Sequence, residues 1–115
     1  GTGQGVIDAA EEVGRYAIGV DTDQDFLAPG HVLTSMMKRV DVGVFNGCKA
    51  VAEGTFEPGI VTLGLPEGGV GYAPTSYEDV DAEILAHVDE LAAKIAAGEI
   101  MVPETPAEAK MFVLE

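Results

Sequence analysis

A chain of 115 residues suits one ordinary domain with a single hydrophobic core, and its 47% of hydrophobic residues excludes a disordered or fibrous segment. Its 20 acidic side chains against 6 basic ones give a formal charge of −14, which repels nucleic acid phosphates and anionic lipid surfaces alike. The sequence opens with no signal peptide pattern and has no apolar run near the roughly 20 residues that cross a bilayer, so we expect a soluble chain with no nucleic acid partner.

The first residues predict a helix, a buried strand and a polar loop. Apolar side chains three or four positions apart predict a helix over about residues 3–13, closed by Gly14. The apolar run 16–20 predicts a strand, and the turn-forming polar residues 21–25 end it.

A second strand and a second helix follow. Residues 31–37 predict a strand that leads directly to Lys38. From Asp41 the spacing of apolar residues predicts a helix that ends at Gly54. We expect its buried face to carry Val44, Phe45, Cys48 and Val51, which makes Cys48 a small core residue.

The next segment predicts a third strand over residues 60–65, a glycine-rich turn over 66–69 and a short strand-like piece over 70–72. A capping box at Ser76 and Asp79 precedes the most regular helix of the chain. Gly98 ends this helix, whose apolar stripe consists of Ile84, Val88, Leu91 and Ile95. Thr105 and Pro106 then predict the cap and the first residue of a short last helix.

Strands that alternate with helices predict an α/β fold with a Rossmann-like parallel sheet and flanking helices. The sequence starts in a glycine turn where a strand should lead into the first helix. We therefore expect this chain to be part of a longer protein.

Two charged residues stand where open α/β sheets bind ligands, beyond the carboxyl ends of strands. Asp21 follows the first predicted strand, and its carboxylate could accept two hydrogen bonds from the vicinal hydroxyls of a sugar. Lys38 follows the second and could donate to the same ligand. The residues alone also fit an ordinary loop aspartate and a strand-end lysine whose chain lies along the surface.

Other motifs do not predict a catalytic, cofactor or metal site. Gly1, Gly3 and Gly5 lack the preceding strand and the sixth-position glycine or alanine of a dinucleotide fingerprint, so we expect a tight turn with free N–H groups there. The alternating aspartates 21, 23 and 25 lack the glycine and the glutamate of a calcium loop. His31 and His87 have no metal-ligand spacing. No nucleophile elbow, zinc-protease helix or Walker loop occurs, so we predict neither enzyme activity nor a cofactor.

Four runs together resemble the basic membrane protein (BMP) family of ABC-importer substrate-binding lipoproteins, several of which bind purine nucleosides. They are GTGQGVIDAA at 1–10, IGVDTDQ at 18–24, VLTSMMKRVD at 32–41 and LGLPEGGVG at 63–71. The resemblance extends from residue 1 to about 102 and implies the C-terminal portion of a type I periplasmic binding protein fold. Residues 1–38 and about 70–102 would belong to the second lobe, and about 39–65 to the first.

The resemblance also implies roles for single residues. Asp21 would hold ribose hydroxyls and Lys38 would lie near a crossover and the ligand, while Gly68 and Gly69 would form a turn that lines the cleft; Gly1 and Gly3 would also touch the ligand. The implied partners are a small molecule, with a purine nucleoside expected, and an ABC permease. The implied location is the periplasm or cell surface, with a lipidated N-terminus outside this sequence as the anchor.

The sequence also fits two other hypotheses. In the first, the chain is a non-catalytic module without a ligand, which self-associates through the faces of Val44, Phe45 and Val51. The family resemblance itself implies instead that the chain dimerises or pairs with a missing N-terminal half. In the second, it is a flavodoxin-like or Rossmann enzyme, for which the glycine pattern supplies no cofactor site.

Overall fold

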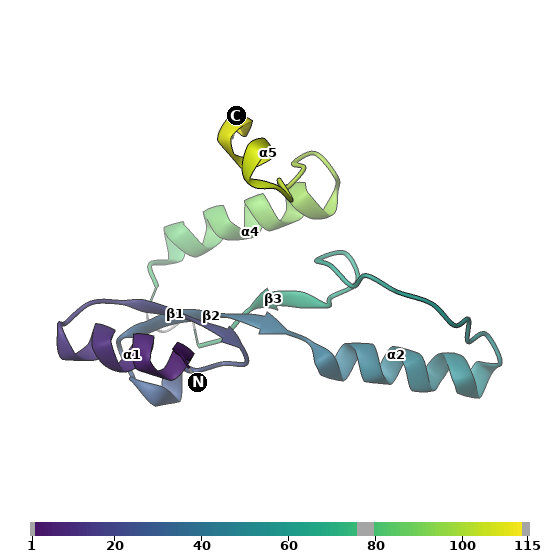
Figure 1. Cartoon of the computed structure of the whole chain (residues 1–115), viewed down its shortest axis with the longest axis horizontal. Helices are drawn as coiled ribbons and strands as arrows, with labels where there is room; N and C mark the ends of the chain where they lie inside the picture. Colours follow the sequence, from purple (N-terminus) through teal and green to yellow (C-terminus); the bar gives the residue numbers. More distant parts are fainter. Residues whose placement is uncertain (1, 76–79, 114–115) are drawn as a thin grey trace.

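The computed structural model describes residues 2–75 and 80–113, and Figure 1 shows the order of its elements. These elements are α1 (Thr2–Glu12), β1 (Ala17–Asp21), the 3-10 helix η1 (Asp25–Leu27), β2 (Val32–Lys38), α2 (Val40–Glu53), β3 (Val70–Tyr72), α4 (Ala82–Ala96) and α5 (Pro106–Met111). The predicted first two helices and first two strands are confirmed, each to within a residue at either end.

The sheet has the order β1-β2-β3 and combines both pairing directions. β1 and β2 run parallel, with Asp21 opposite Met37. β3 runs antiparallel to β2, with Val70 opposite Lys38. The α/β class with flanking helices is confirmed, whereas a purely parallel sheet is not formed. The chain leaves the sheet at the carboxyl end of β2 and returns to the sheet at that same end. β3 therefore runs antiparallel to β2.

The predicted strand over residues 60–65 is wrong. This segment is irregular and passes into a turn, and Ile60 and Val61 are 101% and 74% exposed. In the described part of the chain no strand lies beside it, so its backbone has no ladder to join, and an apolar β-type sequence alone does not make a strand.

Helix α2 points away from the sheet (Figure 1), and this overturns the predicted buried face. None of its residues is buried, Phe45 is 66% exposed, and Cys48 is exposed rather than a core residue. The predicted end is correct, since Gly54 caps the helix in the left-handed conformation with φ 71°.

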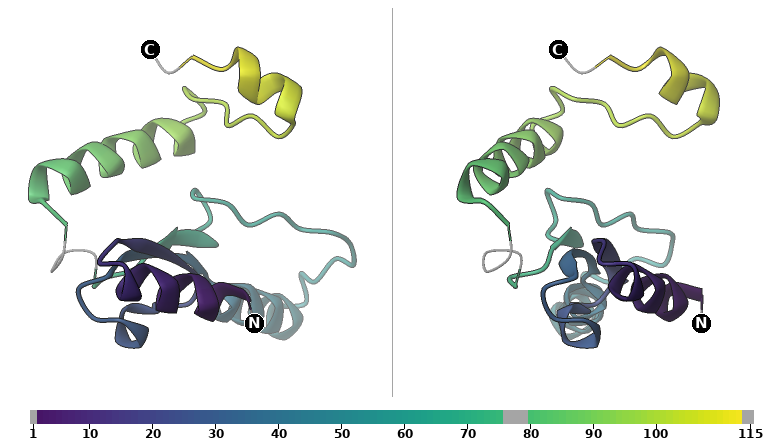
Figure 2. Two further views of the ribbon diagram at one scale, coloured as in Figure 1. Left: turned by 60° about the vertical axis from the view of Figure 1, so that its left-hand side comes forward. Right: turned by 90° about the vertical axis from the view of Figure 1, so that its left-hand side faces the viewer.

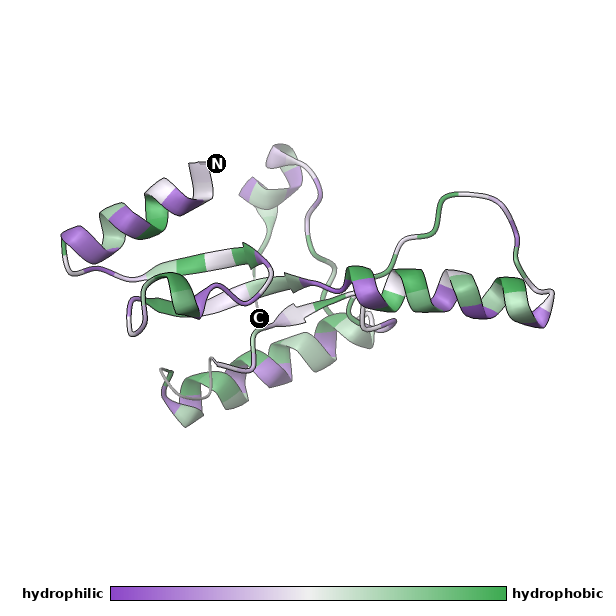
Figure 3. Cartoon of the chain, turned by 90° about the horizontal axis from the view of Figure 1, so that it is seen from below, coloured by the Kyte–Doolittle hydropathy of each residue, from purple (hydrophilic) through white to green (hydrophobic). Residues whose placement is uncertain are grey.

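The core lies between α1 and the first two strands. Ile7 of α1, Ala17 of β1, Ala28 after η1 and Val32 of β2 form one buried cluster, in which the helix and the loop after η1 pack against the first residues of the two strands. Helices α1 and α4 lie on opposite sides of the sheet (Figures 2 and 3). No helix among the described residues is both long and apolar enough to span a bilayer.

Helix α4 begins after Asp81, whose side chain accepts a hydrogen bond from Glu83 N at 2.8 Å; the predicted capping box at Ser76 and Asp79 lies outside the described residues. Its predicted stripe faces the sheet through Val88, Leu91 and Ile95, across an apolar groove of about 340 Å³. Ile84 is 58% exposed, and Leu85 is the buried residue of this turn instead. The predicted Thr105 cap and Pro106 start of α5 are confirmed.

Candidate functional site

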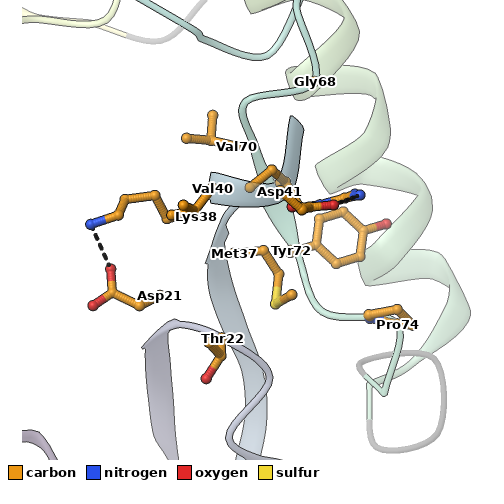
Figure 4. Close-up of a pocket in the computed structure, with 12 residues that line it drawn as sticks. Asp21, Thr22, Met37, Lys38, Val40, Asp41, Gly68, Val70, Tyr72 and Pro74 are labelled. Atoms are coloured by element: carbon orange, nitrogen blue, oxygen red, sulfur yellow. Dashed lines mark hydrogen bonds and ion pairs between the residues drawn. The ribbon is translucent and has the colours of Figure 1, made fainter. Parts of the chain in front are cut away.

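A groove of about 840 Å³ opens at the carboxyl ends of β1 and β2 (Figure 4). Its walls come from three segments: the end of β1, residues 37–41 where β2 passes into α2, and residues 68–74 around β3. Because parallel strands end at the same edge of a sheet, side chains that follow β1 and β2 meet there. The volume falls in the range of small-molecule sites.

Asp21 and Lys38 lie next to each other on one side of this groove (Figure 4). Lys38 Nζ lies 3.5 Å from Asp21 Oδ1. The pairing of Asp21 with Met37 places the aspartate one residue from the lysine along the neighbouring strand. Both side chains remain open to a ligand, since Asp21 is 62% and Lys38 59% exposed. Together they offer carboxylate acceptors and an ammonium donor to one bound molecule.

Asp21 adopts an unusual backbone conformation. Its φ is 73°, and it is the single non-glycine residue with positive φ among the described residues. The left-handed region costs an L-residue about 1–2 kcal/mol, although aspartate tolerates it better than most side chains. Such a conformation persists only where the surroundings fix it, and it often marks a functional position. The sequence gives no signal for it apart from the preference of aspartate.

The glycine-rich turn closes the groove on the side of β3. Gly68 lines the groove with φ 67°, a conformation that favours glycine. Gly69 lines a neighbouring recess of about 420 Å³ beside α2. A Cβ at Gly69 would collide with the Leu63 carbonyl, so the turn closes this tightly only with glycine there. Gly69 O accepts a hydrogen bond from Arg39 N at 2.9 Å, which ties the turn to the end of β2.

An ion pair that the sequence analysis did not predict lies on the wall of the groove. Arg39 Nε and Nη2 donate to the two oxygens of Asp41 at 3.0 and 2.8 Å. The hydrogen bond from Arg39 holds the pKa of Asp41 below its usual range, and the same hydrogen bond raises the pKa of Arg39. The Arg39–Asp41 pair is hydrogen-bonded at two points, whereas Asp21 and Lys38 make one longer contact of 3.5 Å, so the hydrogen-bonding capacity of Asp21 and Lys38 is less fully used. The sequence signal for this ion pair was an arginine two residues before an aspartate at the start of a predicted helix.

Tyr72 is a further groove residue that sequence reasoning missed. Its ring forms part of the wall in Figure 4, and its hydroxyl donates to Asp89 Oδ1 of α4 at 2.7 Å. It reaches the groove because β3 runs antiparallel beside β2, and no sequence pattern predicted that pairing.

The remaining candidates lie elsewhere. Gly1 is outside the described residues, and Gly3 is an exposed residue of the first turn of α1, not one of the groove-lining residues. His31 Nδ1 lies 3.0 Å from Arg15 O, and His87 Nδ1 lies 4.0 Å from Glu90 Oε2. Among residues 2–75 and 80–113, no group of three His, Cys, Asp or Glu side chains is placed to hold a metal ion.

Comparison with known families gives a match over most of the chain. Residues 1–106 match the Bmp family, described as ABC transporter substrate-binding protein PnrA-like. The chain belongs to this family. Basic membrane protein A of Borreliella burgdorferi is 36% identical over 98% of the chain and 34% of its own length. An uncharacterized lipoprotein of Pyrococcus abyssi is 46% identical over 59% of the chain and 18% of its own length.

The chain therefore spans about a third or less of the length of these relatives. Among solved structures, an ABC transporter solute-binding protein of Aeropyrum pernix K1 matches 93% of the chain and 39% of its own, with 27% identity and a TM-score of 0.65. A transcriptional activator of the comK gene from Bacillus halodurans matches 87% of the chain and 35% of its own, with 24% identity and a TM-score of 0.77, which shows a shared fold.

Proposed function

We propose that this chain supplies part of the ligand site of an ABC-importer solute-binding protein, and that it holds the ribose of a nucleoside. In this proposal Asp21 accepts hydrogen bonds from vicinal hydroxyls while Lys38 donates to the same sugar. The observation that carries it is the Asp21–Lys38 pair, 3.5 Å apart, in a groove at the carboxyl ends of two parallel strands. Carboxylate and ammonium groups suit hydroxyls, which both donate and accept.

The proposal includes a division of the chain between two lobes. Residues 1–38 and about 70–102 belong to the lobe that carries β1, β2 and β3, and about 39–65 belong to the other. It is supported by the projection of α2 away from the sheet, with no residue of this helix buried. The groove then lies where the chain passes from one lobe to the other, and closing of the lobes covers the sugar.

Capture in this proposal involves no chemical step. A ligand that binds the closed arrangement better than the open one shifts the protein toward closure, and an ABC permease recognises the closed form. The lipoprotein names of relatives support a membrane-anchored position outside the cytoplasm. Gly68 and Gly69 shape the wall near the sugar, and Gly1 and Gly3 also contact the ligand in this proposal.

Calorimetric titration of the full-length protein with inosine, guanosine, adenosine and ribose tests this function. We expect saturable nucleoside binding, weakened about tenfold or more by Asp21→Ala, since a hydrogen bond to a charged group contributes about 1.5–3 kcal/mol. The wild type should bind 2′,3′-dideoxyinosine, which lacks these hydroxyls, more weakly than inosine by a similar factor. The Asp21→Ala variant should bind the two ligands with nearly equal affinity. Glu12→Ala, which removes the same charge at the end of α1, is the matched control. Equal affinities for Asp21→Ala and the control would contradict the proposal.

A further inference from the structure

The loop that carries Asp21 is tied to the buried centre of the sheet through two side chains. Val20 N donates to Gln24 Oε1 at 2.8 Å. Gln24 N in turn donates to Ser35 Oγ of β2 at 3.0 Å. Ser35 is 0% exposed, so its hydroxyl is a fixed point within the sheet. The chain of contacts therefore runs from the interior of β2 through Gln24 to the residue just before Asp21.

Gly19 provides the space for this arrangement. A Cβ at Gly19 would press on Ser35 Oγ and would lie 2.8 Å from Gln24 Oε1. Real Cβ atoms do not approach other atoms so closely, and a buried serine has no room to move away. Because Gly19 has no Cβ, there is room beside β1 for the Ser35 hydroxyl, which accepts from the Gln24 backbone N–H, and for the side-chain oxygen of Gln24.

A second tie fixes the loop on the other side of Asp21. Thr75 Oγ1 donates to the Asp23 carboxylate, at 3.0 Å from both of its oxygens. Asp25 N also donates to Asp23 Oδ1, at 3.2 Å. Asp21 thus lies between Val20, bound through its N–H, and Asp23, bound through its carboxylate. Restraints on both sides explain how the residue keeps a φ of 73°.

We propose that Gln24 and Ser35 are positioning residues, which hold Asp21 in its left-handed conformation so that its carboxylate faces Lys38 and the groove. Neither side chain is among the groove-lining residues, so both act through Asp21 and not on the ligand. The inference rests on the proposed function for its binding measurement, but not for its structural one. Gln24 is the better residue to test, because it is only partly buried and its removal leaves the core intact.

The binding measurement is a double-mutant cycle on the full-length protein, with inosine as the titrated ligand. Gln24→Ala should weaken binding about five- to tenfold, most of the effect of losing the Asp21 contact. Gln24→Glu keeps an oxygen acceptor for Val20 N and should restore binding to within about threefold of wild type. In an Asp21→Ala background, Gln24→Ala should change affinity by less than about twofold. An equal loss in both backgrounds would show that Gln24 acts independently of Asp21 and would overturn the inference.

The structural measurement is amide hydrogen exchange of the same variants without ligand. Gln24→Ala should speed exchange at Val20 about tenfold or more, since that N–H loses its acceptor, and Gln24→Glu should return it toward the wild-type rate. Unchanged exchange at Val20 in Gln24→Ala would overturn the inference whatever the binding data show. Absence of inosine binding by the wild type, together with the expected exchange pattern, would reject the proposed nucleoside function and leave the positioning of Asp21 supported.

Discussion

The hydroxyl of Tyr72 donates a hydrogen bond to Asp89 Oδ1 at 2.7 Å, which joins β3 to the helix that covers one face of the sheet. The apolar groove between the sheet and α4 lies beside this contact and has a volume of about 340 Å³. Because this groove lies between the apolar stripe of α4 and the sheet, the polar contact is an important connection between them.

We therefore expect Tyr72→Phe to lower the free energy of unfolding by about 0.5–1.5 kcal/mol, the net value of one such hydrogen bond. Urea unfolding followed by circular dichroism measures the change. Tyr16→Phe is the matched control, because the side chain of Tyr16 is 67% exposed and the substitution removes the same atom. Equal effects of the two substitutions would show that the Tyr72 contact adds nothing to stability.

Gly19→Ala should destabilise the chain by about 1–3 kcal/mol, since the new methyl group overpacks a site beside the buried Ser35. The control is Gly5→Ala in α1, where no atom lies within 4 Å of the new Cβ. That substitution should stabilise the helix by about 0.5–1 kcal/mol, because alanine is the better helix former. Thermal unfolding of both variants distinguishes them by the sign of the change. A stabilising Gly19→Ala would mean that Ser35 and Gln24 do not pack against this position.

Two substitutions at Asp21 separate backbone conformation from charge. Asp21→Asn should leave the free energy of unfolding nearly unchanged, because asparagine also tolerates a φ of 73°. Asp21→Val should lower it by about 1–2 kcal/mol, since a β-branched residue is strained there. Denaturant unfolding of both variants measures the difference. If valine were as well tolerated as asparagine, residue 21 would not occupy the left-handed region in solution.

The last helix should respond to acid through Glu108. Its carboxylate accepts hydrogen bonds from Glu104 N and Thr105 N at 2.9 and 3.0 Å, which lower its pKa from the ordinary value of 4.5. A group whose folded pKa is depressed stabilises the fold fully above its unfolded pKa, and this stabilisation is lost as the pH falls through the folded pKa. We therefore expect α5 to fray on acidification below about pH 4.5.

Amide chemical shifts of Glu104 and Thr105, followed by NMR during an acid titration, measure this loss. Glu108→Gln is the control, since glutamine keeps an acceptor for the capping box but does not titrate. The two amides should stay constant with pH in that variant. If they shifted as in the wild type, another group would be responsible for the pH response.

Local patterns were enough to predict the elements whose limits depend on local chemistry. The end of α2 at Gly54 follows from a glycine that can adopt the left-handed conformation, and the start of α5 follows from Thr105 and Pro106. The segment 60–65 failed because a strand needs a neighbour, which its own sequence cannot supply. Cys48 failed for a related reason: periodicity identifies an apolar face but not what covers it.

The same division holds in the candidate site. The positions of Asp21 and Lys38 were predictable, because each lies at the carboxyl end of a strand, where it is the last strand residue, and such positions meet at one edge of a sheet. Tyr72 was not, because its place depends on the antiparallel pairing of β3 with β2. The roles of Gln24 and Ser35 depend on contacts between segments, which residue types alone do not reveal.

The hydrogen bond between Arg39 N and Gly69 O places side by side the two points where the chain leaves the sheet and returns to it. The segment between Arg39 and Gly69 is therefore connected to the sheet at two adjacent points. The length of such an excursion is only weakly constrained by thermodynamics, since doubling a flexible loop adds only about 0.6 kcal/mol of closure entropy. Evolution or protein engineering can therefore lengthen, shorten or exchange the part of this excursion that lies beyond the groove, residues 45–60, while the sheet and the groove-lining residues next to it keep their places.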